Sequence, residues 1–253
     1  MASRVRADVA LVERGFFESR ARARAAIEAG LVTADGVHIG KPSEALLPDA
    51  RVDASAPHPW VSRGGVKLAH ALDHFGFDPA GRLCLDIGSS TGGFTQVLLA
   101  RGAALVIAVD VGYGQLRPSL ANDPRVMSLE KTDARALTRE TIERAARDAD
   151  LDAARTMLIT CDVSFIGLDK VLPSALTLAT PRSELVALIK PQFEAGDSRR
   201  KGGVVKDAAL HQQVCKNVAQ TVTSLGFDVL GIEASPIFGG DGNREFLIGA
   251  RRA

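Results

Sequence analysis

Residues 83–94 read Leu-Cys-Leu-Asp-Ile-Gly-Ser-Ser-Thr-Gly-Gly-Phe, an apolar run that passes into a glycine-rich turn. A helical pattern follows from Phe94 to Ala100. Gly88, Gly92 and Gly93 allow positive φ and a close approach of the backbone to a ligand, and the start of the helix directs unpaired N–H groups toward it. The stretch predicts a nucleotide-cofactor loop between a strand and a helix, although the same glycines also fit a tight turn without a ligand.

The glycine spacing and the nearby acids indicate which nucleotide is bound. A dinucleotide site needs G-x-G-x-x-G, and this loop spaces its glycines differently. Asp86 at the strand end repels pyrophosphate but attracts the cationic amino group of a methionine moiety. Asp110 ends the next apolar run, where a carboxylate can bind both ribose hydroxyls. S-adenosylmethionine is therefore favoured over NAD. The predicted cofactor-binding residues are Asp86, Gly88, Ser89, Ser90, Thr91, Gly92, Gly93, Phe94, Asp110 and Asp133. For Asp133, a helix cap is an equally good role.

Composition limits the class of protein. The chain has 253 residues, of which 46% are hydrophobic, enough for one large domain and a small one. With a formal net charge of +1, any nucleic-acid contact must come from a local basic face. Three cysteines without C-x-x-C spacing indicate reduced thiols, and no metal site is expected. Because there is no apolar signal core and no run of about 18 apolar residues, a soluble cytoplasmic protein is expected.

The chain divides where Pro57, Pro59 and small residues interrupt any periodic pattern. We expect a small domain at residues 1–56, a linker at 57–62 and a larger domain at 63–253. Alternating strand and helix patterns predict a Rossmann-like α/β domain, with a mostly parallel sheet and an antiparallel last strand. The predicted strands cover residues 83–87, 104–109, 126–130, 156–161, 184–190, 228–233 and 245–251.

The first 56 residues fit a small α+β unit of two helices and a few short strands. The expected elements are a helical face at Val5, Val9, Leu11 and Val12, a second helix at 20–28 that Ser19 caps, a hairpin of 31–33 and 37–39, and a strand near 51–53. In the second helix, Arg20 and Arg24 share a face with Arg22 at its flank, where RNA phosphates can reach them. A solvated charged face is the alternative explanation.

One pattern decides between these two explanations. The series Gly15-x-x-x-Ser19-Arg20-x-x-Ala23, followed by Gly30-Leu31-Val32 and Lys41-Pro42-Ser43, resembles the S4 RNA-binding domain over residues 4–53. The resemblance implies two helices and a hairpin that bind structured RNA through its shape and phosphates. The residues expected to bind RNA are Arg4, Arg6, Arg20, Arg22, Arg24, Lys41 and Arg63.

Four polar residues occupy strand ends or turns that should converge at the ligand side of the sheet. Lys190 and Asp162 end apolar strands, Glu245 opens the last strand, and Lys67 begins a helix. Singly, each has a plain explanation as a charge at the edge of a core. Residues 196–203, which are basic and glycine-rich, fit either a loop that closes over RNA or an ordinary surface loop.

Taken together, these residues belong to five motifs. The motifs are Ser62-Arg63-Gly64-Gly65-x-Lys67-Leu68, the loop from Leu85 to Thr95, Cys161-Asp162-Val163-Ser164-Phe165-Ile166, Leu188-Ile189-Lys190-Pro191-Gln192-Phe193-Glu194 and Gly242-Asn243-Arg244-Glu245-Phe246. They resemble the TlyA family across nearly the whole chain. The resemblance implies an FtsJ-like domain that uses S-adenosylmethionine to methylate ribose 2′-hydroxyls of ribosomal RNA, 16S, 23S or both, with ribosomal RNA or ribosomal subunits as partners. It also implies a catalytic tetrad of Lys67, Asp162, Lys190 and Glu245.

The chemistry agrees with this assignment. A ribose 2′-hydroxyl is a weak nucleophile and must lose its proton as it attacks a sulfonium methyl group, so a base is required. We expect Lys190 to accept the proton, Asp162 and Glu245 to orient the lysines, and Lys67 to position the hydroxyl or a nearby phosphate. Other possibilities stay open: methyl transfer to a base or a protein, an RNA-binding ribosome assembly factor with little catalysis, or a membrane-acting haemolysin, a name that some TlyA-like proteins carry.

Overall fold

A computed structural model of the chain describes residues 4–152, 157–194 and 204–252. The chain folds as two units, Met1–Pro59 and Trp60–Ala253. The basic segment 196–203 lies outside the described residues. Within the described ranges, no helix is long and apolar enough to cross a membrane. The same ranges contain no group of three His, Cys, Asp or Glu side chains that could hold a metal ion.

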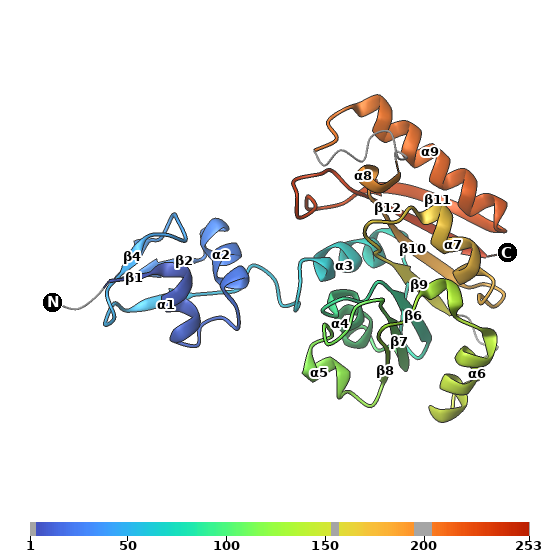
Figure 1. Cartoon of the computed structure of the whole chain (residues 1–253), viewed down its shortest axis with the longest axis horizontal. Helices are drawn as coiled ribbons and strands as arrows, with labels where there is room; N and C mark the ends of the chain where they lie inside the picture. Colours follow the sequence, from blue (N-terminus) through green and yellow to red (C-terminus); the bar gives the residue numbers. More distant parts are fainter. Residues whose placement is uncertain (1–3, 153–156, 195–203, 253) are drawn as a thin grey trace. The chain divides into compact units, whose positions relative to one another are not determined.

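The N-terminal unit packs two helices against short strands (Figure 1). Its elements are β1 (Val5–Arg6), α1 (Ala7–Glu13), α2 (Arg20–Glu28), β2 (Val32–Ala34), β3 (Val37–His38), β4 (Ala45–Leu46) and β5 (Val52–Ala54). β2 lies between β3 and β5 in a three-stranded sheet, while β1 pairs with β4. Apolar side chains from both helices and β2, among them Leu11, Ile27 and Val32, form its core.

Capping and turn chemistry explain why the second helix forms as predicted and why a hairpin forms, although its first strand is Val32–Ala34 rather than 31–33 and its second ends at His38 rather than at residue 39. The N–H of Arg22 donates to Oγ of Ser19 at 3.4 Å, which caps α2. Asp35 and Gly36 have φ of 51° and 77°, as a two-residue hairpin turn requires. The prediction that Val5 belongs to the first helix is wrong, because Val5 lies in β1. Only two residues of β1 pair with β4, too few for an alternating pattern to reveal a strand.

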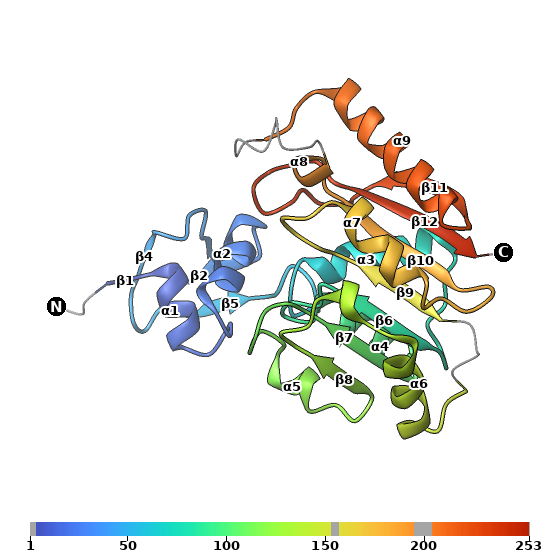
Figure 2. The same ribbon diagram turned by 45° about the vertical axis from the view of Figure 1, so that its right-hand side comes forward.

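The second unit is built on a seven-stranded sheet in the order β11-β12-β10-β9-β6-β7-β8. Its strands are β6 (Leu83–Ile87), β7 (Leu105–Val109), β8 (Val126–Leu129), β9 (Leu158–Cys161), β10 (Glu184–Ile189), β11 (Phe227–Ala234) and β12 (Phe246–Arg252). β6 to β10 run parallel, and β12 runs antiparallel to both β10 and β11. Figures 1 and 2 show these strands side by side. The predicted sheet and its antiparallel last strand are confirmed.

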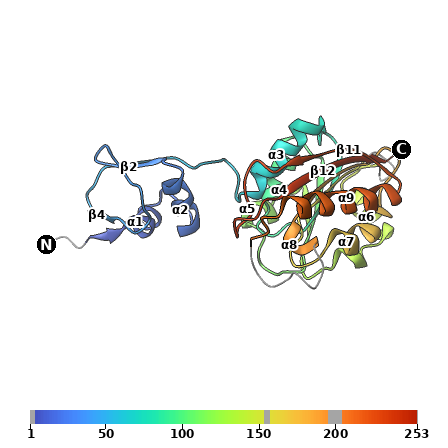
Figure 3. The ribbon, with the colours of Figure 1, turned by 90° about the horizontal axis from the view of Figure 1, so that it is seen from above.

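Helices cover both faces of this sheet. They are α3 (Gly64–Phe75), α4 (Gly93–Ala100), α5 (Pro118–Ala121), α6 (Arg139–Asp148), α7 (Leu168–Leu176), α8 (Pro191–Glu194) and α9 (Ala208–Ser224), with a 3₁₀ turn, η1 (Ala134–Ala136). α3 and α4 contribute to one apolar core, and α6, α7 and α9 contribute to another. Figure 3 shows α3 and α7 on opposite sides of the strands. The central strands are buried on both faces, which is why they are apolar apart from Asp86 in β6 and Glu184 at the start of β10.

The carboxyl ends of the parallel strands meet at one edge of the sheet, and the polar candidates follow them there. Asp110 follows β7, Asp162 follows β9 and Lys190 follows β10. β12 pairs with β10 in the register Ile189↔Phe246, which brings Glu245 to the same edge. Glu245 comes directly before β12 rather than inside it, and Lys67 lies in the first turn of α3, which begins at Gly64.

Candidate active site

The glycine-rich loop between β6 and α4 is held against two neighbouring strands. Gly88 has φ of +80°, a value that residues with side chains rarely adopt. A Cβ at Gly88 would lie 2.4 Å from the carbonyl oxygen of Asp162, so the loop passes directly against the end of β9. Ser90 also has positive φ, 46°, and its N–H donates to Oδ2 of Asp110 at 2.8 Å. The loop is thereby tied to the end of β7 as well.

Two cavities open at this edge of the sheet. The larger has a volume of about 580 Å³, and Asp110 and Asp133 lie in its wall. The smaller has a volume of about 260 Å³, and Lys67 and Lys190 lie in its wall. Both cavities are lined by Gly88, Ser90, Asp162 and Ser164. A ligand that follows the glycine-rich loop can therefore extend from one cavity into the other.

The predicted cofactor residues divide between these cavities. The smaller cavity alone is lined by Ser89, Thr91, Gly93 and Phe94, and the larger alone by Asp110 and Asp133. Both cavities are lined by Gly88 and Ser90. Neither cavity is lined by Asp86 or Gly92. The two carboxylate oxygens of Asp110 accept the N–H groups of Ser90 at 2.8 Å and Gly112 at 2.7 Å. Each oxygen has a second lone pair, which leaves acceptor capacity for ribose hydroxyls.

Asp133 forms the cap that was the alternative to cofactor binding. Its carboxylate accepts the backbone N–H of Arg135 at 2.9 Å and lies 2.6 Å from Nη2 of the same residue. The hydrogen bond from the Arg135 guanidinium, followed by the backbone N–H, lowers the pKa of Asp133 to about 2. The carboxylate also lines the larger cavity, so a contact with adenine stays a prediction.

Asp86 is fully buried beneath the glycine-rich loop. Its carboxylate accepts the hydroxyl groups of Thr95 at 2.6 Å and Thr160 at 3.1 Å. Burial raises the pKa of Asp86 to about 6, and the two hydroxyl hydrogen bonds oppose this rise. Sequence reasoning missed both threonines, because one Thr in a helix and one in a strand carry no signal of a shared partner. The predicted action of Asp86 on the methionine amino group stays a prediction.

Replacing Asp86 by asparagine should remove a pH-dependent loss of stability. Because the folded pKa lies above the unfolded value, the fold favours the protonated acid, and stability falls as pH rises through the folded pKa. The rise of about two pKa units corresponds to about 3 kcal/mol. Without cofactor, Asp86→Asn should therefore gain stability over the wild type between pH 4 and 7. Urea unfolding at several pH values measures the difference, and two parallel stability curves would contradict the expectation.

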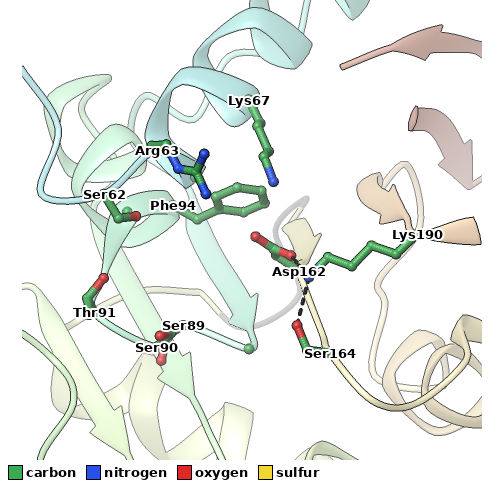
Figure 4. A pocket seen from close by; sticks show the side chains of 13 residues that line it. Ser62, Arg63, Lys67, Ser89, Ser90, Thr91, Phe94, Asp162, Ser164 and Lys190 are labelled. Carbon is green, nitrogen blue, oxygen red and sulfur yellow. Dashed lines mark hydrogen bonds and ion pairs between the residues drawn. The ribbon is translucent and has the colours of Figure 1, made fainter. Parts of the chain in front are cut away.

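Four charged side chains form two ion pairs at the smaller cavity. Nζ of Lys67 lies 2.5 Å from Oε2 of Glu245, and Nζ of Lys190 lies 2.6 Å from Oδ1 of Asp162. The two lysine side chains are only 9% and 10% exposed. Figure 4 shows Lys67 reaching toward Asp162 from above and Lys190 reaching toward it from the right. The structure thus brings the four predicted catalytic residues together, with Glu245 holding Lys67 from outside the cavity wall.

Ser164 is a site residue that sequence reasoning missed. Nζ of Lys190 donates to its Oγ at 2.9 Å, the dashed line in Figure 4. It lies two residues after Asp162, so Lys190 contacts two residues of one loop. The motif contained Ser164, but nothing in its spacing indicated that its hydroxyl would meet a lysine from the next strand.

The loops after β9 and β10 are joined by two further contacts. The ring centroids of Phe165 and Phe193 are 5.2 Å apart. Oε1 of Glu194 accepts the N–H of Leu168 at 2.9 Å, at the start of α7. Burial raises the pKa of Glu194 to about 7. These contacts fix the segment that follows Lys190 to the segment that follows Asp162.

The basic residues expected to bind RNA lie in both units. Arg63 precedes α3, and its side chain lines the smaller cavity (Figure 4). In the N-terminal unit, Arg6 and Arg20 both donate to the carboxylate of Asp8. Arg22 follows two residues after Arg20 on α2, and its side chain is partly buried. The remaining candidates, all exposed, are Arg4, Arg24 and Lys41.

Comparisons with known proteins agree with the two-unit structure. The sequence profile of the FtsJ-like methyltransferase family matches residues 60–252, and the profile of the S4 domain matches residues 5–52. The chain is 45% identical to the 16S/23S rRNA (cytidine-2'-O)-methyltransferase TlyA of Mycobacterium tuberculosis, over 99% of this chain and 91% of that protein. It is 36% identical to Hemolysin A of Brachyspira hyodysenteriae, over 96% of this chain and 98% of that protein.

Solved structures of other proteins are also similar to this chain. A Streptococcus thermophilus protein that carries the name hemolysin is 36% identical, with a TM-score of 0.73 over 100% of this chain and 90% of that chain. A Listeria monocytogenes protein named as an S-adenosylmethionine-dependent methyltransferase has a TM-score of 0.52 at 13% identity, over 76% of this chain and 100% of that chain. The second likeness shows a shared fold alone.

Proposed function

Because the chain belongs to the TlyA family of FtsJ-like methyltransferases, we propose that it transfers a methyl group from S-adenosylmethionine to ribose 2′-hydroxyls of ribosomal RNA. The observation that carries this proposal is the pair of buried ion pairs, Lys67 with Glu245 and Lys190 with Asp162, beside the glycine-rich loop. Such charges are costly to bury unless they are paired, and three of them, Lys67, Asp162 and Lys190, line the smaller cavity, which supports a role in chemistry rather than in packing.

The two cavities fit the cofactor in size and in chemistry. The larger, at about 580 Å³, lies within the range of small-molecule sites, and Asp110 offers carboxylate oxygens to a ribose there. The loop from Ser89 to Gly93 and the start of α4 would hold the methionine portion, with backbone N–H groups available to its carboxylate. When bound, S-adenosylmethionine supplies an electrophilic methyl group on a sulfonium centre.

The residues of the smaller cavity have separate roles in the proposed reaction. In this proposal the ammonium group of Lys190 first releases a proton to solvent. Its amine then accepts the proton of the 2′-hydroxyl as the oxygen attacks, which restores the ammonium ion that Asp162 stabilises at 2.6 Å. The hydroxyl of Ser164, 2.9 Å from Nζ of Lys190, fixes the direction of that amine. Lys67, held by Glu245, positions the 2′-oxygen or the neighbouring phosphate.

The N-terminal unit is the proposed RNA-binding domain, at residues 1–56, joined by a linker at 57–62 to the methyltransferase domain at 63–253. Its exposed arginines and lysine supply the basic surface that a chain of nearly neutral net charge otherwise lacks. Ribosomal RNA or a ribosomal subunit is the proposed partner, and the cytoplasm is the proposed compartment.

Methyl transfer from tritiated S-adenosylmethionine to ribosomal subunits and to their extracted RNA tests the proposed function. We expect the label to lie in nucleotides whose 3′-side phosphodiester bond resists alkaline cleavage, because a methylated 2′-oxygen cannot attack the phosphate. Nuclease mapping then identifies the nucleotides. Cofactor binding without label on any RNA would point to an RNA-binding assembly factor instead. Leakage of liposomes on addition of the purified protein would support a haemolysin.

A further inference from the structure

One buried carboxylate in the N-terminal unit holds two arginines from different elements. Nε and Nη2 of Arg6, in β1, donate to the two oxygens of Asp8 at 2.9 and 3.1 Å. Nη2 and Nε of Arg20, at the start of α2, donate to Oδ2 of Asp8 at 2.8 and 3.3 Å. A single carboxylate in the first turn of α1 therefore fixes two guanidinium groups at once.

The exposure of these side chains shows which way the cluster faces. The side chain of Asp8 is fully buried, while those of Arg6 and Arg20 are 50% and 58% exposed. The hydrogen bond from Arg6 is the main cause that lowers the pKa of Asp8 to about 2, so the carboxylate stays ionised at neutral pH. One negative and two positive charges leave a net charge of +1 on the side that faces solvent.

The cluster has donors left for an anion. Each guanidinium has five N–H donors, and Asp8 engages only Nε and Nη2 of each. Among the residues that the structure describes, Nη1 of Arg6 and Arg20 has no hydrogen-bond acceptor. The backbone next to Lys41 lies close to Asp8 in space, because the N–H of Asp8 donates to the carbonyl oxygen of Pro42 at 3.1 Å. Fixed guanidinium forks match the geometry of phosphate oxygens.

We propose that Asp8 is a positioning residue that holds Arg6 and Arg20 as one clamp for an RNA phosphodiester. The inference rests on the proposed function, since it assumes that the N-terminal unit binds RNA. The clamp lowers the entropy that two long side chains lose when they order on a phosphate. Asp8 itself contacts no RNA, and it acts through the two arginines.

A purely structural ion pair is the competing explanation, and the two explanations predict opposite signs. Asp8→Asn keeps the size of the side chain but removes one negative charge from a basic surface. If Asp8 serves only the fold, the extra positive charge should tighten RNA binding. If Asp8 positions the arginines, RNA binding should weaken although the surface has become more positive.

The experiment compares full-length wild type, Asp8→Asn and Asp49→Asn in binding to extracted ribosomal RNA. Asp49 is exposed in the same unit and is not the carboxylate that binds Arg6 and Arg20, so its variant makes the same charge change and leaves the cluster's hydrogen bonds in place. We expect Asp8→Asn to weaken binding about tenfold, as two side chains lose their fixed positions. The slope of log K against log salt should become shallower by about 1–2. Asp49→Asn should bind as tightly as the wild type or slightly more tightly.

Enzyme kinetics separate this role from a general loss of fold. Asp8→Asn should raise KM for RNA and leave kcat at saturating RNA and the affinity for S-adenosylmethionine unchanged. Arg20→Lys is a second variant that keeps the charge and the hydrophobic core but removes the planar fork, and it should weaken RNA binding in the same direction.

The outcomes distinguish a failure of the clamp from a failure of the proposed function. Unchanged or tighter binding by Asp8→Asn, with a wild type that methylates RNA, would overturn the clamp and leave the proposed function standing. If Asp8→Asn unfolds, Arg20→Lys decides in its place, and wild-type binding by that variant would overturn the clamp. A wild type that neither binds nor methylates ribosomal RNA would overturn both.

Discussion

Replacing Lys190 by alanine is expected to lower kcat for methyl transfer by about 10²–10⁴-fold, the range for loss of a general base. The affinity for S-adenosylmethionine should stay near that of the wild type, because Asp110 and Asp133, the residues proposed to bind its adenosine, line the larger cavity, and Lys190 does not. The reason for the loss in kcat is the position of Nζ of Lys190, which contacts both Asp162 and Ser164 at the end of β10. Among the described side chains, no other amine contacts both of these residues. Single-turnover transfer and calorimetric titration of the cofactor measure the two quantities.

The alanine variant leaves Asp162 without its cation, which could unfold the loop for reasons unrelated to catalysis. A double variant, Lys190→Met with Asp162→Asn, removes base and charge together and should fold but remain equally inactive. Lys216→Ala, at an exposed lysine on α9, is the matched control and should turn over like the wild type. If Lys190→Ala keeps more than a small fraction of wild-type turnover, Lys190 is not the proton acceptor.

Replacing Gly88 by alanine should damage cofactor binding and catalysis together. A Cβ there would lie 2.4 Å from the backbone oxygen of Asp162, which cannot move without displacing the carboxylate that we propose to be catalytic. A shift of about 1 Å at a reacting group costs about 10²-fold in rate. We therefore expect Gly88→Ala to lower methyl transfer by about this factor and to weaken S-adenosylmethionine binding as well.

Gly81→Ala is the control that separates two effects of Gly88→Ala, the clash of the new Cβ with Asp162 and the cost of a left-handed backbone conformation. Gly81 has φ of +67°, similar to the +80° of Gly88, but a Cβ there would meet no atom within 4 Å. Both variants should lose about 1–2 kcal/mol of stability from the left-handed conformation. Only Gly88→Ala should lose cofactor affinity and activity. Denaturant unfolding and cofactor titration of the two variants make the comparison, and equal effects in both would refute the explanation.

The parts of the site that follow from local chemistry could be predicted from the sequence. The strand, turn and helix around Gly88 follow from apolar patterning and glycine positions, and the cap at Ser19 and the Asp35-Gly36 turn follow from short-range rules. Each of these depends on a few neighbouring residues. For that reason a single sequence is enough to reveal them.

The pairing of the four proposed catalytic residues could not be predicted in this way. Lys67 and Glu245 are 178 residues apart, and their contact depends on β12 entering the sheet beside β10. Sequence reasoning named the four residues through family resemblance and expected Asp162 and Glu245 to orient the lysines, but nothing in the sequence said which carboxylate pairs with which lysine. The structure gives each lysine its own carboxylate. The threonines on Asp86 and the hydroxyl of Ser164 carried no pattern, since each contact joins separate strands or helices.

The position of β12 between β10 and β11 has a consequence for biosynthesis. During translation, β6 to β10 emerge from the ribosome before β12, so a nascent chain can form the glycine-rich loop and the Lys190–Asp162 pair early. Lys67 gains its partner only after residues 245–252 have been made and have inserted beside β10. If this pair is required for catalysis, as we propose, cofactor binding becomes possible before catalysis does, and an incomplete chain on the ribosome would not modify the ribosomal RNA around it.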